Sequence, residues 1–119
     1  GIEDITYVSY AKCLRIIGNT KLAKRVLTEG LLLYPKSEQI LLEFHNLYDY
    51  LGDWESAKKI AYNLISVNPK QAEYYFRLGR THSYLKNYTK AKQVYQTGLQ
   101  YRHGLTFKKL IKKYKDLLP

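Results

Sequence analysis

The chain has 119 residues, 45% of them hydrophobic and 25% charged, a length and composition suited to one folded domain and unlike those of a disordered segment. Its one cysteine, Cys13, excludes an intramolecular disulfide and a cysteine-rich zinc site, and no apolar run reaches the roughly 18 residues that a membrane-spanning helix needs. The net charge of +10 lies entirely in residues 70–119, because residues 1–69 hold eight basic and eight acidic residues.

Residues 4–37 are predicted to form two helices joined by a turn at Gly18-Asn19. Apolar and small residues recur at three- and four-residue steps on each side of this turn, which is the spacing of one helix face. They are Tyr7, Tyr10, Ala11 and Leu14 before the turn and Ala23, Val26, Leu27 and Gly30 after it. Pro35 ends the unit, since the residue before a proline is pushed out of the helical region.

Two further units repeat this plan, residues 38–71 with a turn at Gly52-Asp53 and residues 72–103 with a turn at Lys86-Asn87. Equivalent positions recur every 34 residues. The recurring columns are Pro35 and Pro69; Gly18, Gly52 and Lys86; Ala23, Ala57 and Ala91; and Gly30, Leu64 and Gly98. Small residues such as Ala11 and Gly79 are expected to let the two helices of a unit approach closely. His45 stands at the equivalent position of the second unit, which we therefore expect to pack more loosely or to tilt.

This period and these columns resemble the tetratricopeptide-repeat family over residues 4–103. The large positions of that pattern correspond to Tyr7, Leu41 and Tyr75, the small ones to Ala11, Ala23, Ala57, Gly79 and Ala91, and the unit-ending proline to Pro35 and Pro69. The sequence departs from the pattern at His45, Leu64 and His103. The resemblance implies an all-α, right-handed α-solenoid of three helical hairpins, in which the first helix of each hairpin lines a concave binding surface.

Residues 104–119 are expected to close the stack as a capping helix with one polar face. Its predicted apolar stripe is Phe107, Leu110, Ile111, Tyr114 and Leu117. We therefore expect residues 1–119 to form a single domain, excised from a larger protein.

No combination of residues predicts catalysis. His45, His82 and His103 fall in different units without a carboxylate at ligand spacing, and no nucleophile, base and orienting group converge. We expect no enzymatic activity and neither a metal nor a cofactor. Cys13 is expected to be an inert core residue on the packed face of its helix.

A second stripe on each first helix, beside the packed one, is expected to line the concave surface. It is rich in Tyr and Arg, residue types that often dominate recognition energies. The predicted groove residues are Lys12, Arg15, Asn46, Tyr50, Arg77, Arg80 and Tyr84. We expect these residues to bind a peptide, a helix or the rest of the parent chain, and we expect the protein to be cytoplasmic. The sequence leaves open whether the chain forms a homo-oligomer. The alternative is a solvated helix face without a ligand.

Some tetratricopeptide domains hold the acidic C-terminal tails of heat-shock chaperones in a clamp of Lys, Asn and Arg. The positions that correspond here are Val8, Lys12, Glu43, Glu73 and Arg77. Because Glu43 and Glu73 would repel a carboxylate, we predict no such clamp.

A basic patch near the C-terminus supports an alternative function, the binding of RNA or of an anionic membrane surface. Its predicted members are Lys108, Lys109, Lys112 and Lys113. Clustered positive charge attracts phosphate groups without regard to sequence, although such patches also serve solubility.

Overall fold

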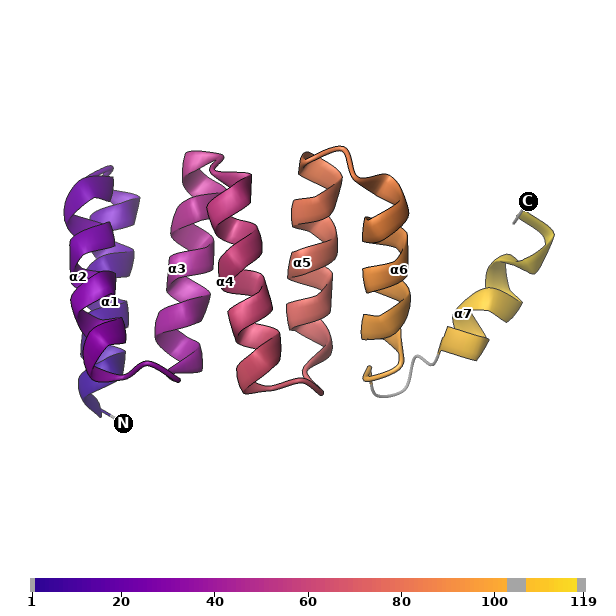
Figure 1. The fold of residues 1–119 in the computed structure, drawn as a ribbon, viewed down its shortest axis with the longest axis horizontal. Coiled ribbons are helices and arrows are strands. Elements are labelled where there is room, and N and C mark those ends of the chain that lie inside the picture. The colour runs from indigo at the N-terminus through magenta and orange to yellow at the C-terminus, as the bar shows by residue number, and fades with distance from the viewer. Residues whose placement is uncertain (1, 103–106, 118–119) are drawn as a thin grey trace.

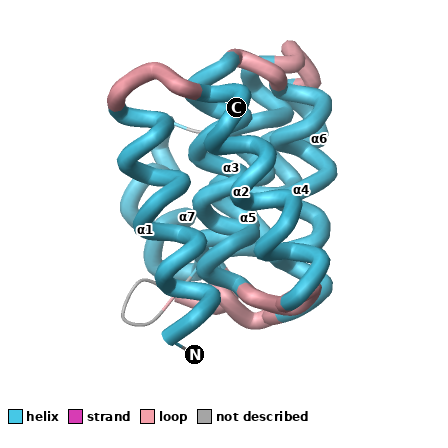
Figure 2. The backbone as a smooth tube through the Cα atoms, turned by 90° about the vertical axis from the view of Figure 1, so that its left-hand side faces the viewer, coloured by secondary structure: helices cyan, strands magenta, loops and turns pink. Residues whose placement is uncertain are grey.

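The structure, a computed structural model, describes residues 2–102 and 107–117. Within these residues it contains helices and no strand. The elements are α1 (Ile2–Ile16), α2 (Thr20–Leu33), α3 (Glu38–Leu51), α4 (Trp54–Val67), α5 (Ala72–Tyr84), α6 (Tyr88–Leu99), α7 (Phe107–Tyr114) and a 3-10 turn, Lys115–Leu117. Helices α1 to α6 form three hairpins that stand side by side in a row (Figure 1), as expected of a right-handed α-solenoid. Viewed along the row, α1 lies on one side and α4 and α6 lie on the other (Figure 2).

The turn inside each hairpin contains one residue in the left-handed backbone region, and all three belong to the same 34-residue column. Their φ angles are +89° at Gly18, +68° at Gly52 and 62° at Lys86. Glycine adopts this conformation without strain, whereas a residue with a Cβ is strained there. The three predicted turns are thereby confirmed, and the third carries strain that the first two avoid.

Small residues allow the helices of a hairpin to pack closely. In the third hairpin a Cβ at Gly79 would lie 2.9 Å from the ring of Tyr95 on α6, and a Cβ at Gly98 would lie 2.8 Å from the Cβ of Tyr75 on α5. Real Cβ atoms essentially never approach this closely, so a larger side chain at either position would force the neighbouring side chains to shift. This confirms the predicted role of Gly79.

The apolar core is unevenly distributed along the row. The larger cluster joins the first two hairpins and reaches Tyr74 on α5; the smaller one consists of Ala61, Leu78 and Val94. Polar bonds supplement the attachment of the third hairpin to the second. The hydroxyl of Tyr74 on α5 donates to Oε1 of Glu38 on α3 at 2.6 Å. Within the second hairpin, Nδ2 of Asn68 donates to the same oxygen at 3.1 Å. The junction between the second and third hairpins therefore combines apolar packing with polar bonds.

The prediction for Cys13 is wrong, because this side chain is exposed. Ala11 and Leu14 are the buried residues of this part of α1. At about 100° per residue, Cys13 projects from a different side of the helix than either of them.

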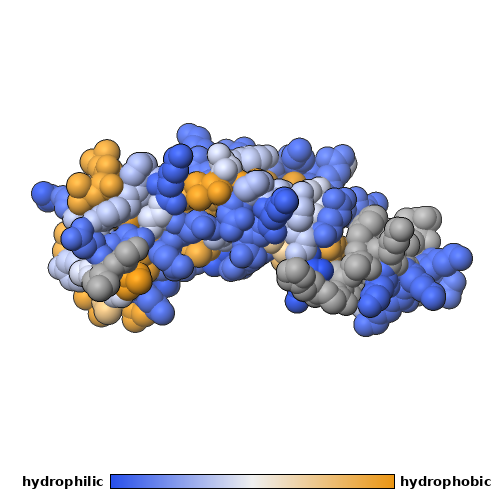
Figure 3. All heavy atoms as spheres, turned by 90° about the horizontal axis from the view of Figure 1, so that it is seen from below, coloured by the Kyte–Doolittle hydropathy of each residue, from blue (hydrophilic) through white to orange (hydrophobic). Residues whose placement is uncertain are grey.

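Helix α7 takes the terminal place in the row, beyond α6 and inclined to it (Figure 1). Hydrophobic residues gather near the end formed by α1 and α2 (Figure 3). Most of the predicted apolar stripe of the closing helix lies outside the described side chains, namely Phe107, Leu110, Ile111 and Leu117. His103 also lies outside the described residues.

Candidate peptide-binding groove

A cavity of about 540 Å³ lies where the C-terminal halves of α1, α3 and α5 meet the start of α4. Its lining residues are Arg15, Asn46, Asp49, Tyr50, Trp54, Arg80 and Tyr84. Tyr50 and Tyr84 are 58% and 54% exposed, so both of these large rings are accessible at the surface of this cavity. Exposed tyrosines beside guanidinium groups are suited to recognition of another chain.

The cavity unites five of the seven predicted groove residues: Arg15, Asn46, Tyr50, Arg80 and Tyr84. Arg77 lines a second cavity of about 290 Å³ further along α5, together with Glu73, Phe76, Arg80 and Tyr95. Lys12 is exposed on α1 and lines neither cavity. The first helices thus bring most of the predicted residues together along one surface.

Arg15 is held in place by a nearly buried carboxylate. Its Nε lies 2.8 Å from Oε1 of Glu43 on α3, whose side chain is only 4% exposed. The other carboxylate oxygen of Glu43 accepts a bond from Nδ2 of Asn46 at 3.1 Å. Arg15 uses Nε for this pair. The two terminal nitrogens of its guanidinium group make no hydrogen bond to another described residue.

Arg77 and Arg80 on α5 reach across to α3. Nη1 of Arg77 donates to Oδ1 of Asn46 at 2.9 Å and to Nδ1 of His45 at 3.0 Å, and Nε of Arg77 pairs with Glu73 at 3.2 Å. Nη2 of Arg80 pairs with Oδ2 of Asp49. These contacts link the second hairpin to the third and fix both guanidinium groups at the groove.

His45 is fully buried beneath this layer, at the position where the other two units have a small residue. Arginine can only donate, so Nδ1 of His45 accepts the bond from Arg77 and the ring proton is on Nε2, 3.4 Å from Oγ1 of Thr81. Burial lowers the pKa of His45 from 6.5 to about 4; Asp49 opposes this shift, and Arg77 and Arg80 reinforce it. His45 is therefore neutral at neutral pH and serves as an acceptor that orients Arg77.

Trp54 is a cavity residue that sequence reasoning did not assign to the groove. It begins the second helix of its hairpin, where periodicity predicts a packing role. Its ring stacks on that of Tyr84, with centroids 4.0 Å apart and planes at 6°. The signal in the sequence was its place directly after the Gly52-Asp53 turn, at the same end of the hairpin as the groove tyrosines.

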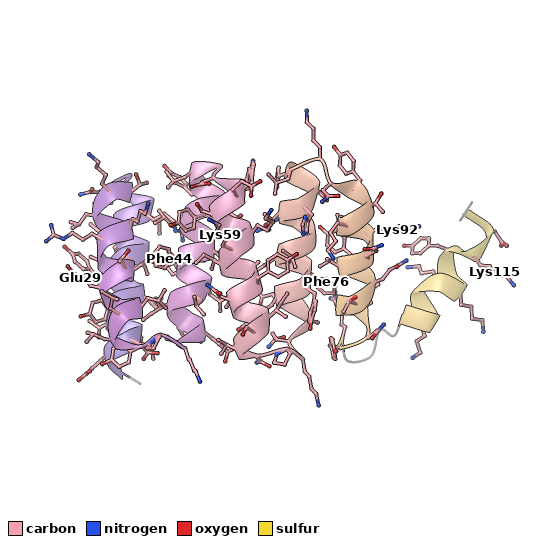
Figure 4. The ribbon with its side chains drawn as sticks, in the orientation of Figure 1. Glu29, Phe44, Lys59, Phe76, Lys92 and Lys115 are labelled. Atoms are coloured by element: carbon pink, nitrogen blue, oxygen red, sulfur yellow. The ribbon has the colours of Figure 1, made fainter. Side chains whose placement is uncertain are left out.

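Aromatic residues also line the second cavity. Phe76 lies between α5 and α6 (Figure 4), with its ring centroid 6.2 Å from that of Tyr95. The guanidinium carbon of Arg102 lies 5.7 Å from the centre of the Phe76 ring. The second cavity therefore offers an apolar wall beside the guanidinium groups of Arg77 and Arg80.

The positions that correspond to a carboxylate clamp are largely occupied by contacts within the chain. Glu43 is paired with Arg15, and Glu73 is paired with Arg77.

The basic patch lies on α7, apart from the groove. The side chains of Lys109, Lys112 and Lys113 are exposed, as is that of the adjoining Lys115 (Figure 4), while the side chain of Lys108 lies outside the described part. Nζ of Lys113 lies 5.3 Å from the centre of the Tyr114 ring.

Among the described residues, no group of three His, Cys, Asp or Glu side chains is placed to hold a metal ion. In the same part of the chain, no helix has the length and apolar character to span a membrane.

Comparison with known proteins identifies the repeat. A family model described as tetratricopeptide repeat matches residues 72–102, and no curated protein sequence matches the chain. The second TPR of Spaghetti (RPAP3), bound to the HSP90 peptide SRMEEVD, superposes with a TM-score of 0.73 at 18% identity, over 83% of this chain and 92% of that chain. The Sgt2 TPR domain from Aspergillus fumigatus gives a TM-score of 0.78 at 21% identity, over 98% of this chain and 80% of that chain.

Identities this low show a shared fold and nothing about ligands. The family model also matches the third hairpin to the tetratricopeptide repeat, and the fold shared with these two domains covers most of the chain. The third hairpin therefore matches the tetratricopeptide repeat, and the chain shares the fold of tetratricopeptide-repeat domains.

Proposed function

We propose that this chain is a non-catalytic protein-interaction module, which binds a peptide, a helix or another part of its parent protein in the groove of its first helices. The cavity at Arg15, Tyr50 and Arg80 is the observation that carries the proposal. Its volume of about 540 Å³ lies in the range typical of ligand sites. Its guanidinium groups are already positioned by the carboxylates of Glu43 and Asp49, which reduces the entropy lost when a ligand binds.

One of the structural neighbours supports a peptide as the ligand. The second TPR of Spaghetti (RPAP3) is bound to a peptide of HSP90. We extend only the general mode to this chain, a peptide lying on a solenoid of helical hairpins, and not the identity of that peptide.

The test is an unbiased selection of peptides by the purified chain, followed by affinity measurements on groove variants. Tyr50→Ala and Arg80→Gln are expected to weaken the selected peptides at least about tenfold, as is usual for a central aromatic or arginine contact. Arg25→Gln is the matched control, because Arg25 lies on α2 and its side chain is 77% exposed. The groove is not the binding site if all three variants weaken the affinity for the selected peptides equally, or if none of them weakens it.

We further propose that the groove does not act as a clamp for chaperone tails. Glu43 and Glu73 lie at two of the five clamp positions and already pair with Arg15 and Arg77. A terminal carboxylate would have to displace these pairs or approach two negative charges.

A second candidate function is the binding of a polyanion through the basic patch. It is supported by the exposure of Lys109, Lys112 and Lys113 on the inclined terminal helix. The test is binding of single-stranded RNA and of anionic vesicles at about 50 and 200 mM salt, since phosphate contacts weaken steeply with salt. Salt-sensitive binding that is lost on replacing these lysines with Glu would support this function; no binding at the lower salt concentration would exclude it.

A further inference from the structure

Three groove residues of α5 lie at four-residue intervals on one face of the helix: Phe76, Arg80 and Tyr84. Tyr84 lines the larger cavity, Phe76 lines the smaller one, and Arg80 lines both. The groove thus presents an aromatic wall, a guanidinium group and a second aromatic wall in sequence along α5.

The spacing of these three side chains matches that of an extended peptide. Four residues of an α-helix rise about 6 Å, and two residues of an extended chain rise about 6.6 to 6.8 Å. Alternate side chains of an extended chain point to the same side. A peptide that runs along α5 can therefore place residues i, i+2 and i+4 against Phe76, Arg80 and Tyr84.

Arg80 has the donors that a carboxylate at the middle position requires. Its Nη2 pairs with Asp49, and no other nitrogen of its guanidinium group bonds to a described residue. The side chain is 49% exposed, so a ligand can reach it. The ion pair with Asp49 also holds the guanidinium group in place. A guanidinium group held in one orientation matches the planar geometry of a carboxylate.

The flanking positions suit apolar side chains. Tyr84 lies against Trp54 in a stacked pair, and Phe76 lies against Tyr95, so each cavity has a broad aromatic wall. Such walls gain most from burying another aromatic or large aliphatic side chain.

We propose that the groove recognises an extended peptide segment with apolar residues at positions i and i+4 and an Asp or Glu at position i+2. This inference rests on the proposed function and specifies the ligand of the same groove. It differs from a tail clamp because the acidic side chain is internal and binds at Arg80, where the neighbouring carboxylates of Asp49 and Glu73 are each paired with an arginine.

The test uses four fluorescein-labelled peptides with amidated C-termini and fluorescence anisotropy. The probe GSFSDSFSG carries the pattern, and GSFSNSFSG removes only its charge. GSFDSFSSG has the same composition with shifted spacing, and GSFSDSASG lacks the apolar residue at position i+4. We expect the probe to bind about five- to tenfold more tightly than the Asn peptide, as for a hydrogen bond to a charged group at a half-exposed site, and at least about fivefold more tightly than the other two.

Variants of the protein separate recognition from stability. Arg80→Gln should reduce the preference for Asp over Asn to about onefold, whereas the control Arg25→Gln should preserve it. Tyr84→Ala should reduce the preference for the probe over GSFSDSASG, because Tyr84 faces position i+4. The quenching or enhancement of Trp54 fluorescence reports occupancy of the larger cavity independently, because Trp54 is the single tryptophan.

The outcomes distinguish this inference from the proposed function. Equal affinity for GSFSDSFSG and GSFSNSFSG, or no binding of the probe at about 1 mM, a concentration that detects even about 4 kcal/mol of binding free energy, overturns the peptide pattern. If selected peptides of another pattern then depend on Tyr50 and Arg80, the groove function stands without it. If selected peptides ignore both residues, the groove function fails as well.

Discussion

Removing the cation that pairs with Glu43 should destabilise the whole chain. In Arg15→Met the side chain keeps its apolar stem but loses the guanidinium group whose Nε lies 2.8 Å from Oε1 of Glu43. Glu43 then stays nearly buried, with Asn46 as its remaining hydrogen-bond partner at 3.1 Å. Breaking a buried ion pair from one side typically costs about 3 to 5 kcal/mol, because it leaves an unpaired buried charge.

The structure favours the lower end of this range. The side chain of Arg15 is 20% exposed, so water partly screens the pair and can partly replace the lost cation. We therefore expect Arg15→Met to lower the free energy of unfolding by about 3 kcal/mol. The double variant Arg15→Met/Glu43→Leu should recover most of that loss, because a buried pair can be replaced by apolar residues at little net cost.

Urea denaturation at pH 7, followed by the helical signal in circular dichroism, measures these differences from the transition midpoints at constant m-value. The control is Arg25→Met, which removes an exposed pair with Glu29 and should change stability by less than about 0.5 kcal/mol. The reasoning is refuted if Arg15→Met costs no more than this control. It is also refuted if the double variant is less stable than Arg15→Met alone.

Three further predictions concern the turns, the buried histidine and the groove. Lys86→Gly should stabilise the chain by about 1 kcal/mol, since it relieves a left-handed residue with φ of 62°; an unchanged thermal midpoint would contradict the strain. The pKa of His45 falls from 6.5 in the unfolded chain to about 4 in the folded one. Its contribution to the free energy of unfolding is therefore full above pH 6.5 and is lost as the pH falls toward 4. The loss should be about 2 to 3 kcal/mol by pH 4, and His45→Ala should show a correspondingly shallower decline in denaturation measured across this range. The HSP90 peptide SRMEEVD should not compete for the groove in an anisotropy assay, and competition at micromolar concentration would disprove the absence of a clamp.

The fold was predictable because its signals are local and repeated. Helical periodicity, the glycine column and the unit-ending prolines each act within a few residues, and the 34-residue period reinforces them. Even the exception at Lys86 obeys the column, since it adopts the same backbone conformation as Gly18 and Gly52. The position of Cys13 was predicted wrongly because Ala11 and Leu14, its neighbours along α1, face the core and Cys13 does not.

The groove was predictable only in part. Periodicity assigned Arg15, Asn46 and Arg80 to one surface of the first helices, and the cavity contains all three. Their partners are set by tertiary packing: Arg15 and Glu43 are 28 residues apart, and a single sequence contains no signal for that pair. Trp54 joins the cavity because the turn before it brings its ring onto Tyr84, which periodicity within either helix does not indicate.

The most direct test of the central claim is a map of amide chemical-shift changes when an isotopically labelled chain binds a peptide taken from the unbiased selection. The account predicts changes concentrated on the facing surfaces of α1, α3 and α5, including Tyr50 and Arg80, together with a shift of the Trp54 indole signal. Changes confined to α2, α4 and α6, or to the lysines of α7, would contradict the groove as the binding surface.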